Sequence, residues 1–246
     1  MKYGRHIKLE GAGNFRDLGG FPAVGGLKVK MGRVFRADGL HRLSPADIET
    51  LEGLGISRVF DLRSDLELAS DGVGEFARRN GRHTHVPLVA VALNPFDSKI
   101  DWANMNLNER YLEMLKEGGS SIATVLGALD GSEPGAVLFH CSGGKDRTGV
   151  LAALLLRILG VDDQDIIDDY AVSERFLGGF IDKYRDALVK MGMDEDSIAY
   201  LTSSPPGRMV ETLAKLDSLW GSTDDYLDSI GVGSDLRRRL RDNLLV

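Results

Sequence analysis

The chain has 246 residues, of which 43% are hydrophobic and 27% are charged, and this composition excludes a chain that is disordered throughout. The formal net charge is −7, so the chain has no general attraction for nucleic acid or anionic membrane surfaces. The single cysteine excludes an internal disulfide, no secretory signal follows Met1, and no stretch approaches the roughly 20 apolar residues that span a bilayer. We therefore expect a cytoplasmic protein with no nucleic-acid partner and no integral membrane segment.

The first half of the chain alternates short strand patterns with helix patterns. Residues 26–36 alternate apolar and polar side chains around a turn at Met31, which predicts an early hairpin. Residues 44–54 predict a helix that Ser44 caps and Gly55 ends. The further elements expected here are strands at 59–62 and 83–89 and helices at 107–115 and 121–129.

The second half begins with the clearest strand and helix of the chain. Residues 136–139 are a continuous apolar run of strand length, and residues 150–156 are apolar nearly all round, which predicts a buried helix ending at Gly160. From Asp162 onward the pattern is almost wholly helical, with a break at 204–207. This order predicts an α/β fold with a central, mostly parallel sheet covered by helices on both faces, and a helical C-terminal part.

The turn between that strand and that helix reads HCSGGKDRTG over residues 140–149. Open α/β sheets place their ligands at such a strand-to-helix turn. Backbone N–H groups and the positive end of the helix there favour a dianionic phosphate, and Gly143 and Gly144 let the backbone curl closely around it. A nucleotide-binding loop is excluded, because Asp146 stands where that motif needs Ser or Thr.

Three side chains of this turn predict covalent phosphate chemistry. The field that binds phosphate also favours the thiolate of Cys141, which can attack phosphorus. Arg147, six positions later, can bind two phosphoryl oxygens bidentately and more strongly in the transition state. Thr148 can donate a hydrogen bond to the sulfur and help it leave. We predict a cysteine-dependent phosphatase with Cys141 as nucleophile and Arg147 as clamp, rather than an inert cysteine in a glycine turn.

At this point the sequence resembles a known family. Residues 140–149 resemble the HCxxGxxRTG signature of protein tyrosine and dual-specificity phosphatases. The Lys145-Asp146-Arg147 variant is similar to a bacterial tyrosine phosphatase family with secreted mycobacterial and listerial members, several of which also act on phosphoinositides. The further segments that match this family are residues 14–20, 32–36, 61–64 and 226–244.

The resemblance implies a protein tyrosine phosphatase-like fold over one domain, residues 1–246, with a phosphocysteine intermediate and neither metal nor other cofactor. It implies phosphorylated proteins or phosphoinositides as substrates, with phosphotyrosine first and phosphoserine or phosphothreonine as possible extensions. Some members carry a helical lid, for which residues 173–219 are the candidate. A phosphoinositide-preferring enzyme and a non-catalytic phosphate-binding module remain alternatives, whereas a sulfurtransferase is disfavoured by Arg147 and Thr148.

The general acid is the least determined of the expected roles. The family pattern favours Asp146 and then Asp61, while Asp97 and Asp101 also lie upstream of the cysteine. If Asp146 is not the acid, we expect it to order the loop or to pair with Arg16 or Arg63.

The remaining expectations concern binding and support. The residues expected to contact the phosphate are Ser142, Gly143, Gly144, Lys145 and Thr148, with Lys145 also reaching further substrate phosphates. His140 is expected to organise the loop by hydrogen bonding, and Arg16, with Asn14 and Asp17, to support it. The acidic run at 162–169 is interpreted as charges in the first turns of a helix with a wet face, not a metal site. Residues 237–239 are interpreted as the wet face of a last helix.

Overall fold

The computed structural model describes residues 4–88, 106–178, 185–186, 188–190 and 193–246. One five-stranded sheet lies at its centre, in the order β1-β2-β5-β3-β4. The strands are β1 (Arg16–Asp17), β2 (Val34–Ala37), β3 (Ile56–Asp61), β4 (His83–His85) and β5 (Ala136–His140). Neighbouring strands run parallel except for β1, which pairs antiparallel with β2. The expected central, mostly parallel sheet is confirmed.

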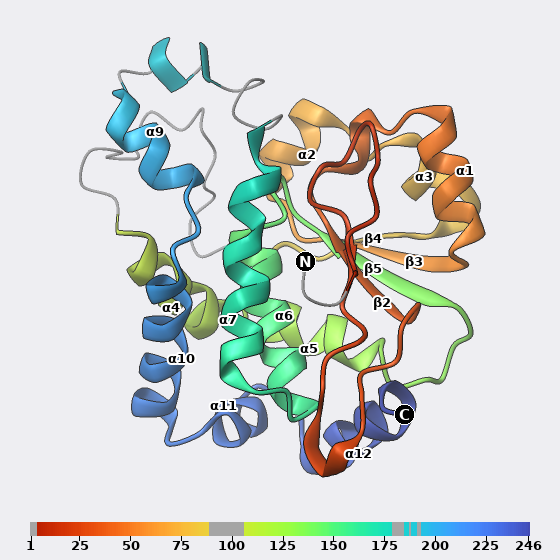
Figure 1. Ribbon diagram of the computed structural model, residues 1–246, viewed down its shortest axis with the longest axis vertical. Coiled ribbons are helices and arrows are strands. Elements are labelled where there is room, and N and C mark those ends of the chain that lie inside the picture. The colour runs from red at the N-terminus through yellow and green to blue at the C-terminus, as the bar shows by residue number, and fades with distance from the viewer. Residues whose placement is uncertain (1–3, 89–105, 179–184, 187, 191–192) are drawn as a thin grey trace.

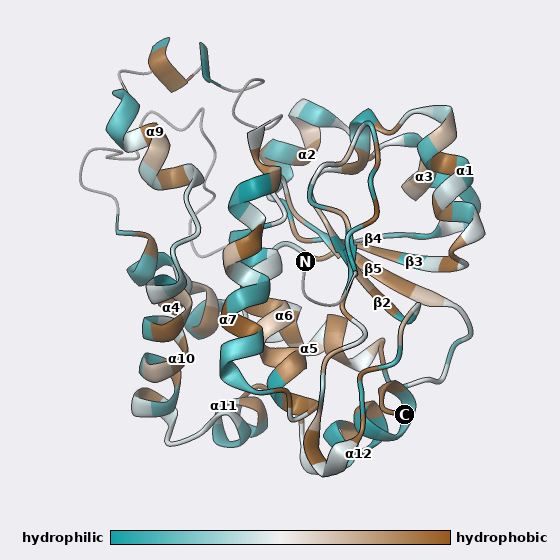
Figure 2. Ribbon diagram, in the orientation of Figure 1, coloured by the Kyte–Doolittle hydropathy of each residue, from teal (hydrophilic) through white to brown (hydrophobic). Residues whose placement is uncertain are grey.

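Helices cover both faces of this sheet, as Figure 1 shows. In β5, Val137 and Phe139 belong to one core cluster, whereas Ala136 and Leu138 belong to another, because successive strand residues point to opposite faces. The helices of the first cluster are α4 (Leu107–Glu117), α5 (Gly119–Gly127), α6 (Asp146–Ile158), α7 (Asp163–Ala171), α10 (Pro206–Trp220), α11 (Thr223–Ser229) and α12 (Ser234–Leu244). The helices of the second are α1 (Pro45–Gly53) and α3 (Glu75–Arg78). Figure 2 shows hydrophobic residues gathered on the strands, α5 and α6 in the middle of the molecule.

Helix α1 begins and ends as its sequence predicts, whereas α6 begins at Asp146, four residues before the expected start at 150, and ends just before Gly160 as expected. The side chain of Ser44 accepts a hydrogen bond from the amide of Asp47 at the start of α1, and Gly55 follows its end with φ +67°. Nearly every residue of α6 is buried, and Gly160 follows that helix with φ +71°. The strand–turn–helix unit β5–α6 is therefore held in the core on all sides.

The expected early hairpin is wrong. Val29 bridges to Leu245 near the end of the chain, and β2 pairs with β1 and β5 instead of with the residues just before its turn. The turn itself is present, and Gly32 adopts φ +73° there. β2 is buried along its whole length. A central position beside β5 provides this burial, whereas a two-stranded hairpin would leave the strand exposed.

The interpretation of residues 237–239 as a wet face is wrong for its first member. Arg237 on α12 is 5% exposed, pairs with Asp228 at 2.6 Å and donates to the carbonyl of Val232 at 2.7 Å. Arg238 and Arg239, by contrast, are exposed. Arg237 satisfies the C-terminal carbonyls after α11, which orders the connection between α11 and α12.

The segment expected as a lid divides into two parts. α10 carries Met209 and Leu213 into the main core, so residues from Pro206 onward belong to the body of the molecule. Leu188, Met193 and Ile198 form a small cluster of their own, together with helix α9 (Glu195–Thr202). A lid formed by the residues before Pro206 stays a prediction. No helix among the described residues is long and apolar enough to cross a membrane.

Candidate active site

The loop after β5 lies at the edge of the sheet where the parallel strands end. On one side, the amide of Leu62, just after β3, donates to the carbonyl of His140 at 2.8 Å. On the other side, the amide of Gly39, just after β2, donates to the carbonyl of Ser142 at 3.0 Å. The two neighbouring strand ends therefore fix the height and direction of the loop, as expected for a ligand site of an open α/β sheet.

The loop carbonyls are bound from beneath by two buried side chains. Asn14 Nδ2 donates to the carbonyls of Gly143 and Gly144, each at 3.0 Å, and Arg36 Nη2 donates to the carbonyl of Gly144 at 2.7 Å. No described peptide bond is cis, so the N–H of each of these peptide groups points away from its carbonyl. The amides of Gly144 and Lys145 are therefore turned to the upper side of the loop, where an anion would lie.

Gly144 is the one residue of the loop that must be glycine. Its φ is +64°, and a Cβ atom built on it would lie 2.5 Å from the carbonyl oxygen of Ala37. Any side chain would push the loop away from β2 and strain the backbone. The curl that was expected of Gly143 and Gly144 is thus a property of Gly144 in particular.

Cys141, Thr148 and Arg147 converge as the sequence predicts. The Thr148 hydroxyl donates to Cys141 Sγ at 3.1 Å, and both side chains are buried. Arg147, in the first turn of α6, is 6% exposed, and its Nε is buried with no hydrogen-bond partner among the described residues. Sequence spacing alone was sufficient for these three positions, since they belong to one loop and the first turn of one helix.

Glu67 is a functional residue that the sequence reasoning missed. Its two carboxylate oxygens accept from Nη1 and Nη2 of Arg147 at 2.5 and 2.7 Å, and one also accepts from the Ser142 hydroxyl at 2.6 Å. Burial disfavours the ionised carboxylate, but the Arg147 guanidinium outweighs burial and lowers the pKa of Glu67 to about 2. Glu67 fixes the guanidinium plane of Arg147 through two parallel hydrogen bonds.

The sequence does contain a signal for Glu67, because this glutamate is the third residue after Ser64. Ser64 and Glu67 form a capping box at the start of α2 (Asp65–Asp71), in which the amide and hydroxyl of Ser64 both donate to Glu67 at 2.9 Å. The S-x-x-E spacing predicts such a box. It orients the carboxylate at the helix end, and the partner that uses it lies 80 positions further along the chain.

Asp61 is placed where a general acid is not expected. Its carboxylate is fully buried, pairs with Arg63 at 2.6 Å and lies 3.3 Å from His83 Nε2. Burial raises the pKa of Asp61, but His140 and Arg63 outweigh it and hold the pKa well below its usual range. An acid that is ionised throughout the neutral range has no proton to give, so the geometry favours an anchoring role for Asp61.

His140 lies between Asp61 and the loop. It is fully buried, its Nδ1 is 3.3 Å from the carbonyl of Cys141, and burial lowers its pKa to about 4. A neutral imidazole that bonds to the backbone agrees with the organising role expected for it.

Asp146, the first residue of α6, is 20% exposed. Its Oδ1 accepts from the Tyr111 hydroxyl and lies 3.2 Å from Lys145 Nζ. The alternative partners expected for it are wrong, because Arg16 binds Asp169 and Asn14 while Arg63 binds Asp61. Asp97 and Asp101, the other upstream candidates, lie outside the described residues.

Lys145 does not extend into the site. It is 2% exposed, and its ammonium donates to the carbonyls of Leu201 and Ser203 at the end of α9, the latter at 2.9 Å. Asp146 takes the third donor. Burial lowers the pKa of Lys145 from its usual value, since these neutral carbonyls compensate little for the lost water. The expected contact between Lys145 and distant substrate phosphates is therefore not available in this arrangement.

Asp169 is the centre of a buried ion cluster beneath the loop. Arg5 and Arg36 bind it at 2.7 Å and Arg16 at 3.1 Å, and all four side chains are buried. Despite burial, these cations hold the pKa of Asp169 well below its usual range. The interpretation of the acidic run as a wet face is thus wrong for Asp169 and for Asp165, which is also buried, whereas Asp162 caps α7.

Arg16 supports the loop through this cluster. Its Nη1 donates to Asn14 Oδ1 at 2.5 Å, and Asn14 in turn binds the loop carbonyls. Arg36 connects the same cluster directly to the loop. Arg16 therefore has the supporting position that the sequence predicts.

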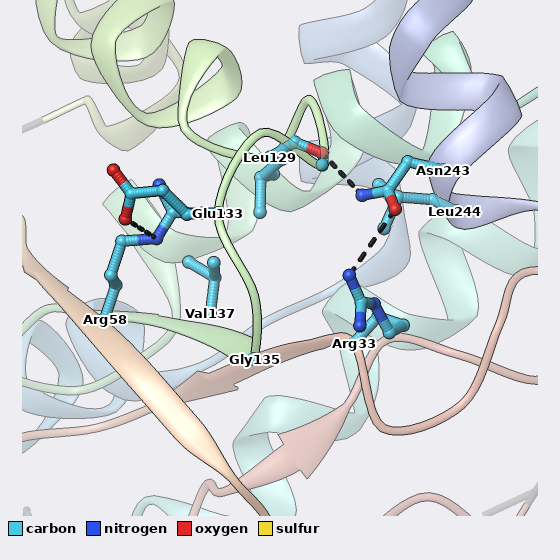
Figure 3. A pocket seen from close by; sticks show the side chains of 9 residues that line it. Arg33, Arg58, Leu129, Glu133, Gly135, Val137, Asn243 and Leu244 are labelled. Carbon is cyan, nitrogen blue, oxygen red and sulfur yellow. Dashed lines mark hydrogen bonds and ion pairs between the residues drawn. The ribbon is translucent and has the colours of Figure 1, made fainter.

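A hollow, which Figure 3 shows, lies at the opposite edge of the sheet, where β3 and β5 begin. Its polar side chains serve to join elements: Asn243 of α12 donates to the carbonyl of Leu129 at 2.9 Å and accepts from Arg33, while Arg58 pairs with Glu133. The hollow therefore marks the attachment of α12 to the sheet. In the described residues, no cluster of His, Cys, Asp or Glu has a geometry that could hold a metal ion.

The loop between β5 and α6 holds a buried cysteine whose sulfur accepts a hydrogen bond from a threonine hydroxyl, and an arginine is fixed in the next helical turn. Together with loop amides that face the anion side, this arrangement defines a cysteine-dependent phosphatase. The chain belongs to the tyrosine phosphatase family, whose model matches residues 7–246. It is 29% identical over 230 residues to a putative tyrosine-protein phosphatase of Cupriavidus necator, covering 91% of this chain and 84% of that one.

Two further relatives are equally similar. A tyrosine-protein phosphatase of Nostoc commune is 29% identical over 228 residues, covering 89% of this chain and 76% of the relative. The triple specificity protein phosphatase PtpB of Mycobacterium tuberculosis is 29% identical over 279 aligned positions, covering 97% and 98%. The resemblance stated from the loop motif is confirmed at the level of the family.

Proposed function

We propose that this chain hydrolyses phosphotyrosine through a phosphocysteine intermediate on Cys141. The observation that carries the proposal is the hydrogen bond of 3.1 Å from Thr148 to Cys141 Sγ, within a loop in which the carbonyls of Gly143 and Gly144 are turned away from the anion side. A structural cysteine needs no donor on its sulfur, whereas a leaving thiolate is stabilised by one.

The first step forms the sulfur–phosphorus bond and breaks the bond between phosphorus and the substrate oxygen. The amides of the loop and Arg147 bind the three non-bridging oxygens, and Arg147 Nε is the buried donor still without a partner among the described residues. Asp146 gives its proton to the leaving oxygen, for which its partial exposure beside the loop is suited.

The second step returns the enzyme to its starting state. Water attacks phosphorus, its proton passes to Asp146, the sulfur–phosphorus bond breaks, and Thr148 stabilises the released thiolate. Atoms and charges balance without a metal, and Cys141, Arg147 and Asp146 act in both half-reactions. Glu67 keeps Arg147 in one orientation throughout.

Phosphotyrosyl protein is the proposed substrate class, and activity toward phosphoserine, phosphothreonine or phosphoinositides is its possible extension. The Mycobacterium tuberculosis relative is described as a triple specificity phosphatase, which supports testing that breadth. Lys145 was the residue expected to bind an additional headgroup phosphate, and its burial against α9 favours the protein substrate. A cytoplasmic location stays a prediction.

The proposal is tested by hydrolysis of p-nitrophenyl phosphate in buffer with a metal chelator, comparing the wild type with Cys141→Ser. We expect turnover by the wild type alone, and a ³²P-phosphotyrosyl peptide should label the wild type, but not the variant, on rapid acid quench. Phosphate binding without turnover would favour a binding module, and transfer of sulfur from thiosulfate to cyanide would favour a sulfurtransferase. The ratio of the hydrolysis rates of a phosphotyrosyl peptide and a short-chain phosphoinositide then shows which of the two substrate classes the enzyme prefers.

A further inference from the structure

A closed ring of hydrogen bonds surrounds the carboxylate of Asp146. Tyr111 of α4 donates to Asp146 Oδ1, and its hydroxyl lies 2.8 Å from that of Tyr170 on α7. Arg208 of α10 donates to Tyr170 at 3.3 Å and to the carbonyl of Ser203 at 2.7 Å. Lys145 completes the ring, since it bonds to Ser203 and lies 3.2 Å from Asp146.

The direction of the donors in this ring is determined by counting protons. A tyrosine hydroxyl has one proton, and that of Tyr111 is used on Asp146, so Tyr111 must accept from Tyr170. The proton of Tyr170 is then used as well, and Tyr170 accepts from Arg208, which has no acceptor atom. The chain therefore runs one way, from the Arg208 cation through two hydroxyls to the carboxylate, an arrangement in which each bond strengthens the next.

Both hydroxyls keep their protons across the neutral range. Burial and the nearby Asp146 carboxylate raise the pKa of Tyr111 well above its usual value, and the same causes raise the pKa of Tyr170 to about 12. Tyr111 is fully buried and its ring packs edge-on against Tyr170, with 6.1 Å between the ring centroids. The donor on Asp146 is thus permanent and rigid.

The ring leaves one carboxylate oxygen available. Tyr111 and Lys145 both bind Oδ1, while no described residue binds Oδ2, and the side chain is 20% exposed beside the loop. A carboxylic acid that donates its proton from one oxygen is better oriented when a hydrogen bond fixes the other oxygen. Without that bond, rotation about the two side-chain torsions would point the O–H group in many directions.

We infer that Tyr111 is a positioning residue for the general acid, holding Oδ1 of Asp146 so that Oδ2 faces the leaving oxygen. The inference rests on the proposed role of Asp146 as that acid. Tyr170 fixes the hydroxyl of Tyr111 by donating a hydrogen bond to it, and Arg208 fixes the hydroxyl of Tyr170 in the same way.

The test compares two substrates on the Tyr111→Phe variant, which loses only the hydroxyl. Phenyl phosphate has a leaving group as basic as tyrosine and needs a proton in the transition state, whereas p-nitrophenyl phosphate scarcely does. We expect kcat to fall about tenfold on phenyl phosphate, the scale of one hydrogen bond to a charged group, with KM unchanged and little loss on p-nitrophenyl phosphate. Equal slowing of both substrates, or of neither, overturns the inference.

Tyr226→Phe is the matched control. Tyr226 is also a fully buried tyrosine, and its hydroxyl donates to the carbonyl of Leu115 on α4 at 2.9 Å, outside the ring around Asp146. It should leave the ratio of the two rates unchanged. If Tyr111→Phe does not fold, Tyr170→Phe replaces it, and a folded Tyr170→Phe without any selective loss on phenyl phosphate contradicts the inference.

Asp146→Asn separates this inference from the proposed function. If Asp146 is the acid, its variant loses about a hundredfold on phenyl phosphate and far less on p-nitrophenyl phosphate, and adding Tyr111→Phe to it causes no further selective loss. If Asp146→Asn is unselective, the acid role itself fails. If Asp146→Asn is selective and Tyr111→Phe is not, only the role of Tyr111 is refuted.

Discussion

Replacing Glu67 by glutamine should destabilise the fold through Arg147. Glutamine keeps the shape of the side chain and removes the charge, so the guanidinium loses its buried counterion. Removal of one partner of a buried ion pair costs about 3–5 kcal/mol. The pKa gives a second figure, since lowering it from 4.5 to about 2 corresponds to about 3 kcal/mol at neutral pH. The two figures agree, and we expect a loss of about 3 kcal/mol in the free energy of unfolding.

The pH dependence identifies the cause. A carboxyl whose pKa is lower in the folded state stabilises the fold above its unfolded value of 4.5, and this stabilisation disappears as the pH falls toward about 2. Urea unfolding of the wild type and Glu67→Gln should therefore differ most at pH 7, and the difference should shrink by about 2 kcal/mol by pH 3. Other titrating groups are common to both proteins and cancel in the difference.

Glu52→Gln is the control for this measurement. Glu52 also binds an arginine with two hydrogen bonds, from Arg82 at 2.8 and 2.5 Å, but on the surface. Water screens that pair, so its variant should unfold together with the wild type at every pH. A loss of stability in Glu67→Gln that is the same at pH 3 and pH 7 would refute the assignment of the effect to the buried charge pair.

Three further substitutions test the loop. Arg147→Lys keeps the charge but loses the planar fork, so turnover of p-nitrophenyl phosphate should fall at least about a hundredfold, and near-normal turnover contradicts the clamp. Thr148→Ala removes the donor on the sulfur, so hydrolysis of the phosphocysteine should become rate-limiting and rapid mixing should show a burst of p-nitrophenol, which a structural Thr148 does not predict. Gly144→Ala must move away from the carbonyl of Ala37, so it should weaken inorganic phosphate binding and lower stability by about 1–3 kcal/mol, measured by calorimetry and thermal unfolding.

The parts of the site that the sequence predicts are those set by short spacings. Cys141, Arg147 and Thr148 lie within eight consecutive residues, and a strand followed by a helix leaves them few ways to be arranged. The capping residues of α1 and the alternation in β5 likewise depend on neighbours along the chain. Patterns of period 2 and 3.6 report such local geometry and the face of each element that is buried.

The partners of these residues could not be predicted in the same way. Glu67 and Tyr111 meet the loop from elements 80 and 35 positions away, and nothing in their own segments identifies Arg147 or Asp146 as the partner. Charge patterns failed for a related reason. Asp169 and Arg237 sit in charged runs that resemble wet helix faces, but each is buried because counterions outside its own run neutralise it: arginines from the start of the chain for Asp169, and Asp228 of the preceding helix for Arg237.

The cradle for the phosphate is closed by contacts between distant parts of the chain. Asn14 reaches Gly144 across 130 positions and Arg36 reaches Asp169 across 133. Closing such long loops is entropically costly and slow, so we expect folding to reach these contacts after the local helices have formed. A phosphate ion that binds the finished loop alone stabilises the native state by mass action and cannot assist the earlier collapse. Refolding in phosphate buffer should therefore raise the final yield of active protein while leaving the fast folding phase unchanged.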